Sequence, residues 1–145
     1  MAEPSRRLFS IAEANAALPA LAARLARLRE LRDRIVRERE RLDVLWQRLD
    51  AGEAVLADLG ARQQALEALA AEFGASIAEL QATGVVVRDL ETGLVDFPAE
   101  VRGIPIFLCW RMGEPGVGFW HGVTEGFAGR RPIAAIQEAT ASGPD

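Results

Sequence analysis

The residues most able to bind a metal or to take part in catalysis lie in the last third of the chain. The sequence has a single histidine, His121, and a single cysteine, Cys109, and the carboxylates Asp96, Glu114 and Glu125 stand around them. Imidazole and carboxylate groups together bind transition metals. His121 with two of the three carboxylates, Asp96 and Glu114 or Glu125, could therefore hold iron or manganese, one histidine short of the usual facial triad.

A second possible chemistry is a reactive thiolate formed by Cys109 beside His121. Residues that face one another across a hairpin share a sheet face, so the connecting loop decides whether these two side chains meet. A four-residue loop over 113–116 places them on opposite faces, whereas a three-residue loop over 114–116 sets Cys109 directly across from His121. Gly116 can supply the left-handed residue that the shorter loop needs. Both registers remain open.

The common catalytic signatures are absent from the sequence. There is no Walker loop, dinucleotide fingerprint, HExxH, CxxC or G-x-S-x-G motif. One histidine and one cysteine exclude the usual multi-His or multi-Cys zinc sites within one chain. A serine hydrolase triad would have to use His121, but every serine lies in a predicted helix or near a terminus. Whether the chain is an enzyme stays open, and the lack of a complete catalytic constellation favours a protein that is not one.

The composition of the chain indicates what class of protein it is and in which cellular compartment it works. A chain of 145 residues, half of them hydrophobic, suits one domain with its own core. The net charge of −4 argues against general attraction to nucleic acid or anionic lipid. A single cysteine fits a reducing compartment, and no stretch approaches the roughly 18 apolar residues of a membrane span. We therefore expect a cytoplasmic protein with no membrane partner.

The first half of the chain predicts helices. Ser10 and Glu13 form a capping box that starts a helix at Ile11. Pro19 predicts the end of this short helix and the start of a second one that runs to about residue 50. That second helix has a heptad-like pattern formed by Leu21, Leu25, Leu28, Ile35, Leu42, Trp46 and Leu49, with Arg32 and Arg39 at two polar seam positions. Leu31, Val36 and Leu45 widen this apolar stripe.

A further amphipathic pattern follows a short linker and predicts an antiparallel partner helix that ends near Gly84. Its apolar positions are Val55, Leu59, Leu66, Leu69, Phe73 and Leu80, with Arg62 and Ser76 at polar seam positions. Residues 21–50 carry nine arginines against six acids, and residues 51–82 carry one arginine against five acids. Two oppositely charged helices can therefore compensate each other.

Short runs rich in β-branched and aromatic residues begin after Gly84. These runs, over 85–90, 93–97, 104–111 and 117–121, predict a meander of three or four antiparallel strands. We expect an α+β fold in which a long antiparallel, coiled-coil-like helical hairpin is followed by a small antiparallel β-meander. The expected organisation is a single domain with the hairpin over 1–84, the sheet packed on it over 85–132, and a weakly structured tail over 133–145.

Several motifs, in order, resemble a bacterial and archaeal family known as domain of unknown function 2203. They are FSIAEANAALP, GLVDFPA, LCWRMGEP, FWH and GFAGRRP, and the resemblance extends over nearly the whole chain to Pro132. The family carries no established activity. The resemblance implies that its characteristic positions correspond to Asn15, Pro19, Gly93, Asp96, Phe97, Pro98, Cys109, Trp110, Gly113, Glu114, Trp120, His121, Gly126, Phe127, Gly129, Arg130 and Pro132.

The first functional hypothesis is a non-enzymatic interaction or scaffold protein. The long apolar stripe predicts self-association through the helices as a homodimer. An unidentified protein partner would bind around residues 113–130, a surface formed by Trp110, Glu114, Trp120, His121, Phe127 and Arg130.

The alternative is a metal-binding protein that holds a divalent transition metal through His121, Asp96, Glu114 and Glu125. A nucleic-acid partner, bound by the arginines of residues 24–41, is the least favoured hypothesis because acids are interspersed among them and the chain is acidic overall.

Overall fold

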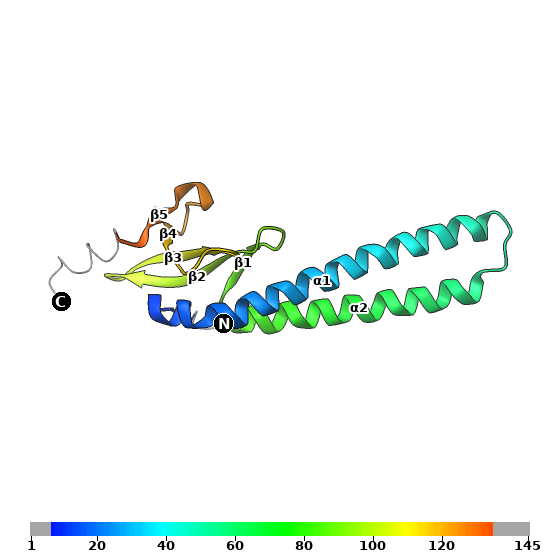
Figure 1. The fold of residues 1–145 in the computed structure, drawn as a ribbon, viewed down its shortest axis with the longest axis horizontal. Coiled ribbons are helices and arrows are strands. Elements are labelled where there is room, and N and C mark those ends of the chain that lie inside the picture. The colour runs from blue at the N-terminus through cyan, green and yellow to red at the C-terminus, as the bar shows by residue number, and fades with distance from the viewer. Residues whose placement is uncertain (1–6, 135–145) are drawn as a thin grey trace, which may run out of the picture. The chain divides into compact units, whose positions relative to one another are not determined.

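A computed structural model describes residues 7–134 of the chain. Two long helices, α1 (Ile11–Asp50) and α2 (Leu56–Ala82), are followed by a five-stranded antiparallel sheet (Figure 1). The expected α+β fold is therefore confirmed. Within the described residues, neither helix is apolar over a length that could cross a membrane. Most of the tail predicted over 133–145 lies outside the described residues.

The start of α1 agrees with the prediction, but the break at Pro19 does not occur. Ser10 Oγ accepts a hydrogen bond from the Glu13 amide at 3.0 Å, and Glu13 Oε1 accepts one from the Ser10 amide at 2.9 Å. The helix then continues through Pro19 as one element. Side chains on both sides of the proline, such as Ala14 and Leu21, are buried. Burial of this continuous stripe outweighs the one backbone hydrogen bond that proline cannot make.

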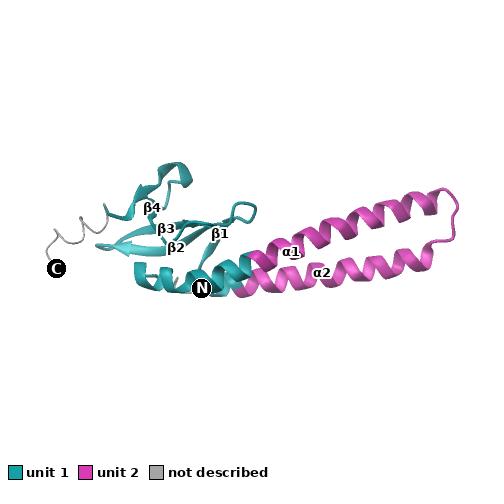
Figure 2. Cartoon of the chain, in the orientation of Figure 1, with its two compact units in different colours: residues 1–25, 80–145 teal, residues 26–79 magenta. Residues whose placement is uncertain are grey.

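The chain divides into two compact units (Figure 2). The first consists of Met1–Leu25 and Leu80–Asp145, which include the start of α1, the end of α2 and the sheet. The second, Ala26–Glu79, is the remainder of the helical hairpin. The five residues singled out from the sequence belong to the first unit: Asp96, Cys109, Glu114, His121 and Glu125.

In the second unit, the α1 seam keeps the predicted positions Ile35, Leu42 and Leu49, and it lies one residue earlier than predicted at the three positions that alternate with them. Leu31, Glu38 and Leu45 are buried, whereas Trp46 is 49% exposed and Arg39 lies at the surface. The expectation of Arg32, Arg39 and Trp46 in the seam is therefore wrong. Leu31 and Leu45 are buried in place of their neighbours Arg32 and Trp46, and Glu38 is buried beside Arg62, with which it forms an ion pair.

The α2 seam follows the prediction more closely. Val55 and Leu59 join Leu42 and Leu45 in a buried cluster between the helices. Arg62, at its predicted polar position, donates to Glu38 Oε1 at 3.0 Å. An ion pair within the seam of this kind fixes the register of the two helices.

The sheet has five strands, which lie in the order of the sequence. Three or four strands were expected. A two-residue turn joins the second strand to the third through Arg102 and Gly103, which have φ values of 52° and 79°. Positive φ at both positions is typical of a type I′ turn, whose twist matches that of the flanking strands. The strands are β1 (Val86–Asp89), β2 (Leu94–Val101), β3 (Ile104–Arg111), β4 (Phe119–Gly122) and β5 (Arg131–Pro132).

One face of the sheet is an apolar core layer. Val95, Phe97 and Leu108 are buried there, and the ring of Phe9, just before α1, packs edge-on against Phe97 at 5.1 Å between ring centroids. The Phe9 amide also donates to the carbonyl of Pro98 at 2.7 Å. Because side chains alternate along a strand, the residues between these core positions point to the opposite face.

Candidate metal centre

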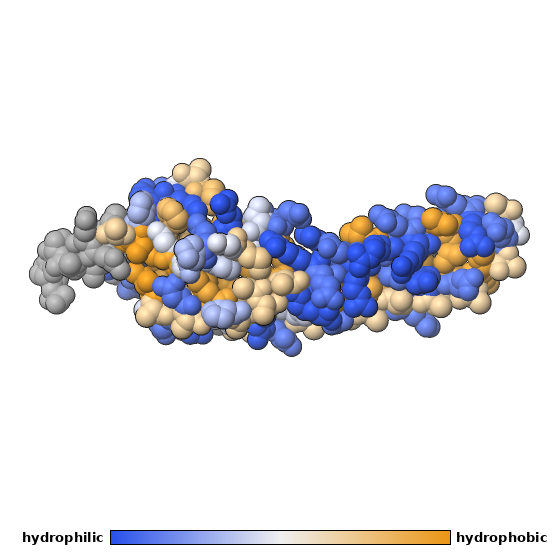
Figure 3. Space-filling model, viewed as in Figure 1, coloured by the Kyte–Doolittle hydropathy of each residue, from blue (hydrophilic) through white to orange (hydrophobic). Residues whose placement is uncertain are grey.

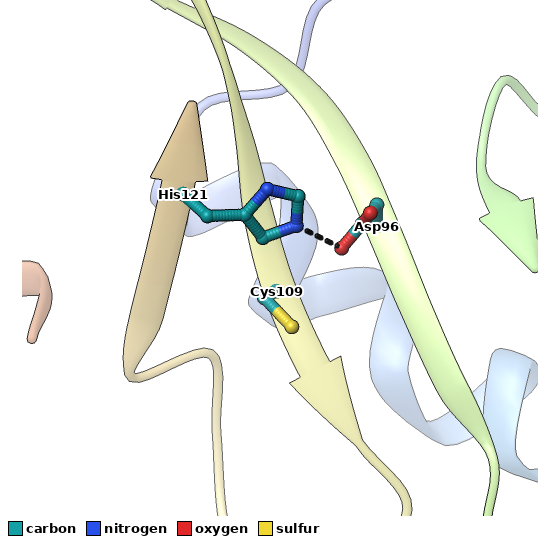
Figure 4. A group of neighbouring side chains, drawn as sticks. All are labelled: Asp96, Cys109 and His121. Atoms are coloured by element: carbon teal, nitrogen blue, oxygen red, sulfur yellow. Dashed lines mark hydrogen bonds and ion pairs between the residues drawn. The ribbon is translucent and has the colours of Figure 1, made fainter. Parts of the chain in front are cut away.

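Three neighbouring strands bring Asp96, Cys109 and His121 together on the face opposite the core layer. Asp96 on β2 lies directly across from Cys109 on β3, and His121 on β4 lies across from Phe107. Positions 107 and 109 point to the same side of β3, so all three side chains share one face. One potential ligand atom from each lies within 4.8 Å of the others (Figure 4). The sheet register thus builds a cluster of carboxylate, thiol and imidazole.

The β3–β4 register differs from both of the predicted ones. His121 pairs with Phe107 and Cys109 pairs with Phe119, because the connection between the strands extends from residue 112 to residue 118. Tertiary hydrogen bonds hold this longer loop: Asn15 Oδ1 accepts from the Val117 amide at 2.8 Å. Cys109 and His121 therefore share a face as diagonal neighbours and are not directly opposite each other.

The hydrogen bonds of His121 define the roles of its two ring nitrogens. Nδ1 lies 2.9 Å from the carbonyl oxygen of Gly122, which can only accept, so Nδ1 carries a proton and donates. Nε2 lies 3.0 Å from Asp96 Oδ1. Metal-binding histidines commonly donate one ring N–H to a backbone carbonyl in this way, which leaves the lone pair of the other nitrogen for the ion. Nε2 is therefore the nitrogen that would face a metal, once the proton needed for its hydrogen bond to Asp96 has been released.

Asp96 is buried, and both of its carboxylate oxygens have partners. It is 1% exposed, and its Oδ2 accepts a hydrogen bond from Arg88 Nε at 2.7 Å. A buried carboxylate is costly unless a cation or hydrogen-bond donors compensate it. Arg88 compensates one oxygen and leaves Oδ1 directed toward His121.

Cys109 is fully buried, and its surroundings disfavour a free thiolate. Burial and, to a smaller extent, the nearby Asp96 carboxylate raise the pKa of the Cys109 thiol to about 11, against the opposing effect of Arg130. His121 cannot readily act as a base for this thiol, since both ring nitrogens are engaged. Without a bound cation, Cys109 is thus a neutral thiol at pH 7, which argues against the reactive-cysteine hypothesis.

A cavity of about 340 Å³ opens directly onto the cluster. The three cluster residues form part of its lining, and the segment that follows β4 supplies much of the rest. The other lining residues are Arg88, Leu94, Val123, Thr124, Glu125, Gly126 and Phe127. Larger hollows exist along the helical hairpin, but arginines, acids and aliphatic residues line them, and neither Cys109 nor His121 is part of their lining.

Two of the ligands predicted from the sequence are engaged elsewhere. Glu114 Oε1 accepts hydrogen bonds from Arg130 and from the Arg111 amide, both at 2.7 Å. Glu125 lines the cavity, but its two oxygens accept from both terminal nitrogens of Arg131 at 2.9 and 2.8 Å. Both carboxylates brace the loops around the cluster and neither converges on His121.

Cys109 is the member of this cluster that the sequence did not predict as a metal ligand, since it indicated only a possible thiolate nucleophile there. Asp96 and Cys109 each occupy an alternate position of a predicted strand, so a prediction of their pairing could have placed them on one face.

The predicted binding surface is partly interior. Trp110 and His121 are each 3% exposed. Phe127 is 45% exposed, and its ring lies 4.7 Å from the guanidinium carbon of Arg130. Trp120 is half-buried. The accessible part of this region is therefore the rim around Phe127.

Comparison with known proteins gives one match. The family model of an uncharacterized conserved protein, DUF2203, matches residues 7–133, which confirms the resemblance seen in the sequence motifs. No curated protein and no solved structure matches the chain.

Proposed function

The chain belongs to the DUF2203 family, and we propose that it is a zinc-binding protein whose ligands are Asp96, Cys109 and His121. The observation that carries this proposal is the convergence of a buried carboxylate, thiol and imidazole within 4.8 Å. Zinc accepts all three donor types, whereas calcium and magnesium prefer oxygen ligands alone.

The separations suit a tetrahedral ion. Zinc bonds of roughly 2.0–2.3 Å place neighbouring ligand atoms about 3.3–3.6 Å apart. The Nε2 of His121 and the Oδ1 of Asp96 already lie 3.0 Å apart. The other separations in the set are at most 4.8 Å, so the three side chains would have to move by about 1 Å to close around an ion.

Charge also supports a cation at this place. A zinc ion would displace two protons, that of the Cys109 thiol and that of the hydrogen bond between His121 and Asp96, since ligand groups bind a metal in their deprotonated form. Its two positive charges would then be cancelled by that thiolate and by the Asp96 carboxylate. Such an ion compensates buried groups that are otherwise expensive to keep away from water.

Metal content across matched variants tests the proposal. Cys109→Ser removes the soft ligand with almost no change in volume, while Glu114→Gln and Glu125→Gln remove the carboxylates that lie in ion pairs. We expect one zinc per chain in the parent protein and in both glutamine variants after dialysis. Cys109→Ser should lower zinc affinity by at least tenfold, with its helical circular dichroism unchanged.

Two results would contradict the zinc proposal. One is a parent protein that fails to retain zinc even after zinc has been supplied. The other is a Cys109→Ser variant that binds zinc as tightly as the parent. Loss of zinc in Glu125→Gln, with zinc retained in Cys109→Ser, would instead support the ligand set predicted from the sequence.

A second function, self-association through the helices, is supported by apolar side chains on the hairpin surface. Val36, Val44 and Trp46 of α1 and Leu56 of α2 are each at least 46% exposed. Figure 3 shows apolar atoms at the surface of the hairpin among charged ones. Burial of such side chains against a second copy is favourable. The interaction or scaffold role with an unidentified protein partner stays a prediction from the sequence.

Light scattering after gel filtration measures the oligomeric state directly. We expect a homodimer in the parent protein and a monomer in Trp46→Glu, with Arg39→Glu as the matched control for added charge on α1. A monomeric parent at micromolar concentration would refute the dimer.

We also propose a cytoplasmic location, because a reducing compartment keeps Cys109 available as a ligand.

A further inference from the structure

We propose that the fourth position of the metal is filled by a small organic monoanion, a carboxylate with an apolar body, that enters the cavity beside the cluster. This inference rests on the proposed zinc site. Zinc is four-coordinate in most protein sites, and sites with three protein ligands take an external molecule as the fourth. In the part of the chain that the structure describes, only Asp96, Cys109 and His121 form such a ligand group.

The cavity gives this external molecule a route and a volume. The three ligands are almost completely buried from bulk solvent, yet all three line the cavity of about 340 Å³. Pockets that hold small organic molecules begin at about 300 Å³. A ligand of modest size can thus reach the metal position without displacing a strand.

The charges around the cavity favour a single negative charge on the ligand. Zinc would be neutralised by the Asp96 carboxylate and the Cys109 thiolate, with His121 neutral. Glu125, the remaining acid in the lining, is paired with Arg131. Arg88 forms an ion pair with Asp96, and when the zinc ion and the Arg131 partner of Glu125 are included the lining groups sum to one positive charge. A monoanion completes the balance, whereas a dianion would exceed it.

Arg88 is placed to assist the incoming anion. Its Nε bonds Asp96, its side chain is 43% exposed, and its guanidinium carbon lies 4.9 Å from the centroid of the Phe107 ring. The planar guanidinium has further N–H donors in addition to Nε. Those donors suit a carboxylate head bound at the adjacent metal position.

The other walls of the cavity favour an apolar body on the ligand. Leu94, Val123 and Phe127 line it together with the hydroxyl-bearing Thr124. Phe127 is 45% exposed, which places an aromatic ring partly at the surface of this pocket. A ligand with a carboxylate head and an apolar or aromatic body therefore matches both the charge and the walls.

Cobalt(II) in place of zinc provides a spectroscopic test on the full-length protein. A thiolate-to-cobalt charge-transfer band reports the Cys109 ligand, and the visible d–d bands report the fourth ligand. Acetate and benzoate are the probes, because they share a carboxylate head and differ in body. We expect both to change the d–d bands, and benzoate to bind about tenfold more tightly, which corresponds to about 1.4 kcal/mol.

A variant of Phe127 tests whether the cavity wall causes the preference for benzoate over acetate. Phe127→Ala should remove most of the advantage of benzoate while leaving acetate binding unchanged. The matched control is Ile104→Ala, which removes an apolar side chain that is 65% exposed and absent from the cavity lining. This control should leave the affinity for both probes as it is in the parent.

The outcomes separate this inference from the zinc site. A cobalt protein without a thiolate band would overturn the proposed function itself. The thiolate band could be present while neither acetate nor benzoate changes the d–d bands. This result would overturn the proposal of an external ligand but would support the metal site. Equal affinities for acetate and benzoate, or inorganic phosphate dianion bound more tightly than benzoate, would overturn the proposed ligand class.

Discussion

Replacement of Asn15 tests whether α1 holds the loop between the two strands that carry Cys109 and His121. Asn15 Oδ1 accepts a partly buried hydrogen bond from the Val117 amide at 2.8 Å. Asn15→Ala leaves that amide without its partner, at a cost of about 1–3 kcal/mol. Alanine is a better helix former than asparagine by about 0.6 kcal/mol, which offsets part of the loss. We expect a net destabilisation of about 1–2 kcal/mol.

Urea unfolding followed by tryptophan fluorescence measures this change in the first unit. A Trp46→Phe background removes the tryptophan of the second unit, so that Trp110 and Trp120 report alone. With a slope of about 2 kcal/mol per molar urea, the midpoint should fall by about 0.5–1 M in Asn15→Ala. Asn15→Asp is the matched control, because it keeps the acceptor oxygen and should unfold near the parent midpoint. Equal midpoints for the alanine and aspartate variants would refute the reasoning.

Three further predictions concern buried charged or polar groups. In metal-free protein, alkylation of Cys109 by iodoacetamide should be slow at pH 7–8 and accelerate as the pH approaches the thiol pKa of about 11, since only the thiolate reacts. A rate equal to that of free cysteine at pH 8 would contradict this. Glu38 Oε2 is buried without a hydrogen-bond partner in the described chain, so Glu38→Leu should raise the thermal midpoint of the helices, at a gain of about 1 kcal/mol. A lower midpoint in circular dichroism would show that the ion pair with Arg62 is worth more than the burial cost. Although burial raises the pKa of Glu114, the hydrogen bond from Arg130 and other donors lower it on balance. The stabilisation by Glu114 is therefore present above the unfolded-state pKa and is lost as the pH falls below it, so the urea midpoint should drop less between pH 7 and pH 3 in Glu114→Gln than in the parent.

The helical half of the fold could be predicted well because it depends on local signals. The capping box of Ser10 and Glu13, the apolar stripe of α2 and the glycine after it all act within a few residues of sequence. The continuity of α1 through Pro19 could not be predicted in the same way. It depends on burial against distant parts of the chain, which outweighs the local penalty of proline.

The candidate site was only half predicted, for a similar reason. His121 and Asp96 stood out by residue type, and the structure brings them to 3.0 Å. Whether Cys109 and His121 share a face depends on the register of β3 and β4, and so on the connection between these strands. Asn15, which lies far away in the sequence, accepts a hydrogen bond from that connection. Periodicity carries no information on such a contact, so the sequence did not predict that Cys109 joins the cluster.

X-ray absorption at the zinc edge tests the central claim most directly, because it counts the sulfur atoms bound to the ion. For the zinc-loaded protein, we predict a single sulfur neighbour at roughly 2.3 Å and nitrogen or oxygen neighbours at roughly 2.0–2.1 Å. The sulfur neighbour should be absent in Cys109→Ser. A parent spectrum with no sulfur neighbour would contradict the account, since it would show that Cys109 does not bind the metal.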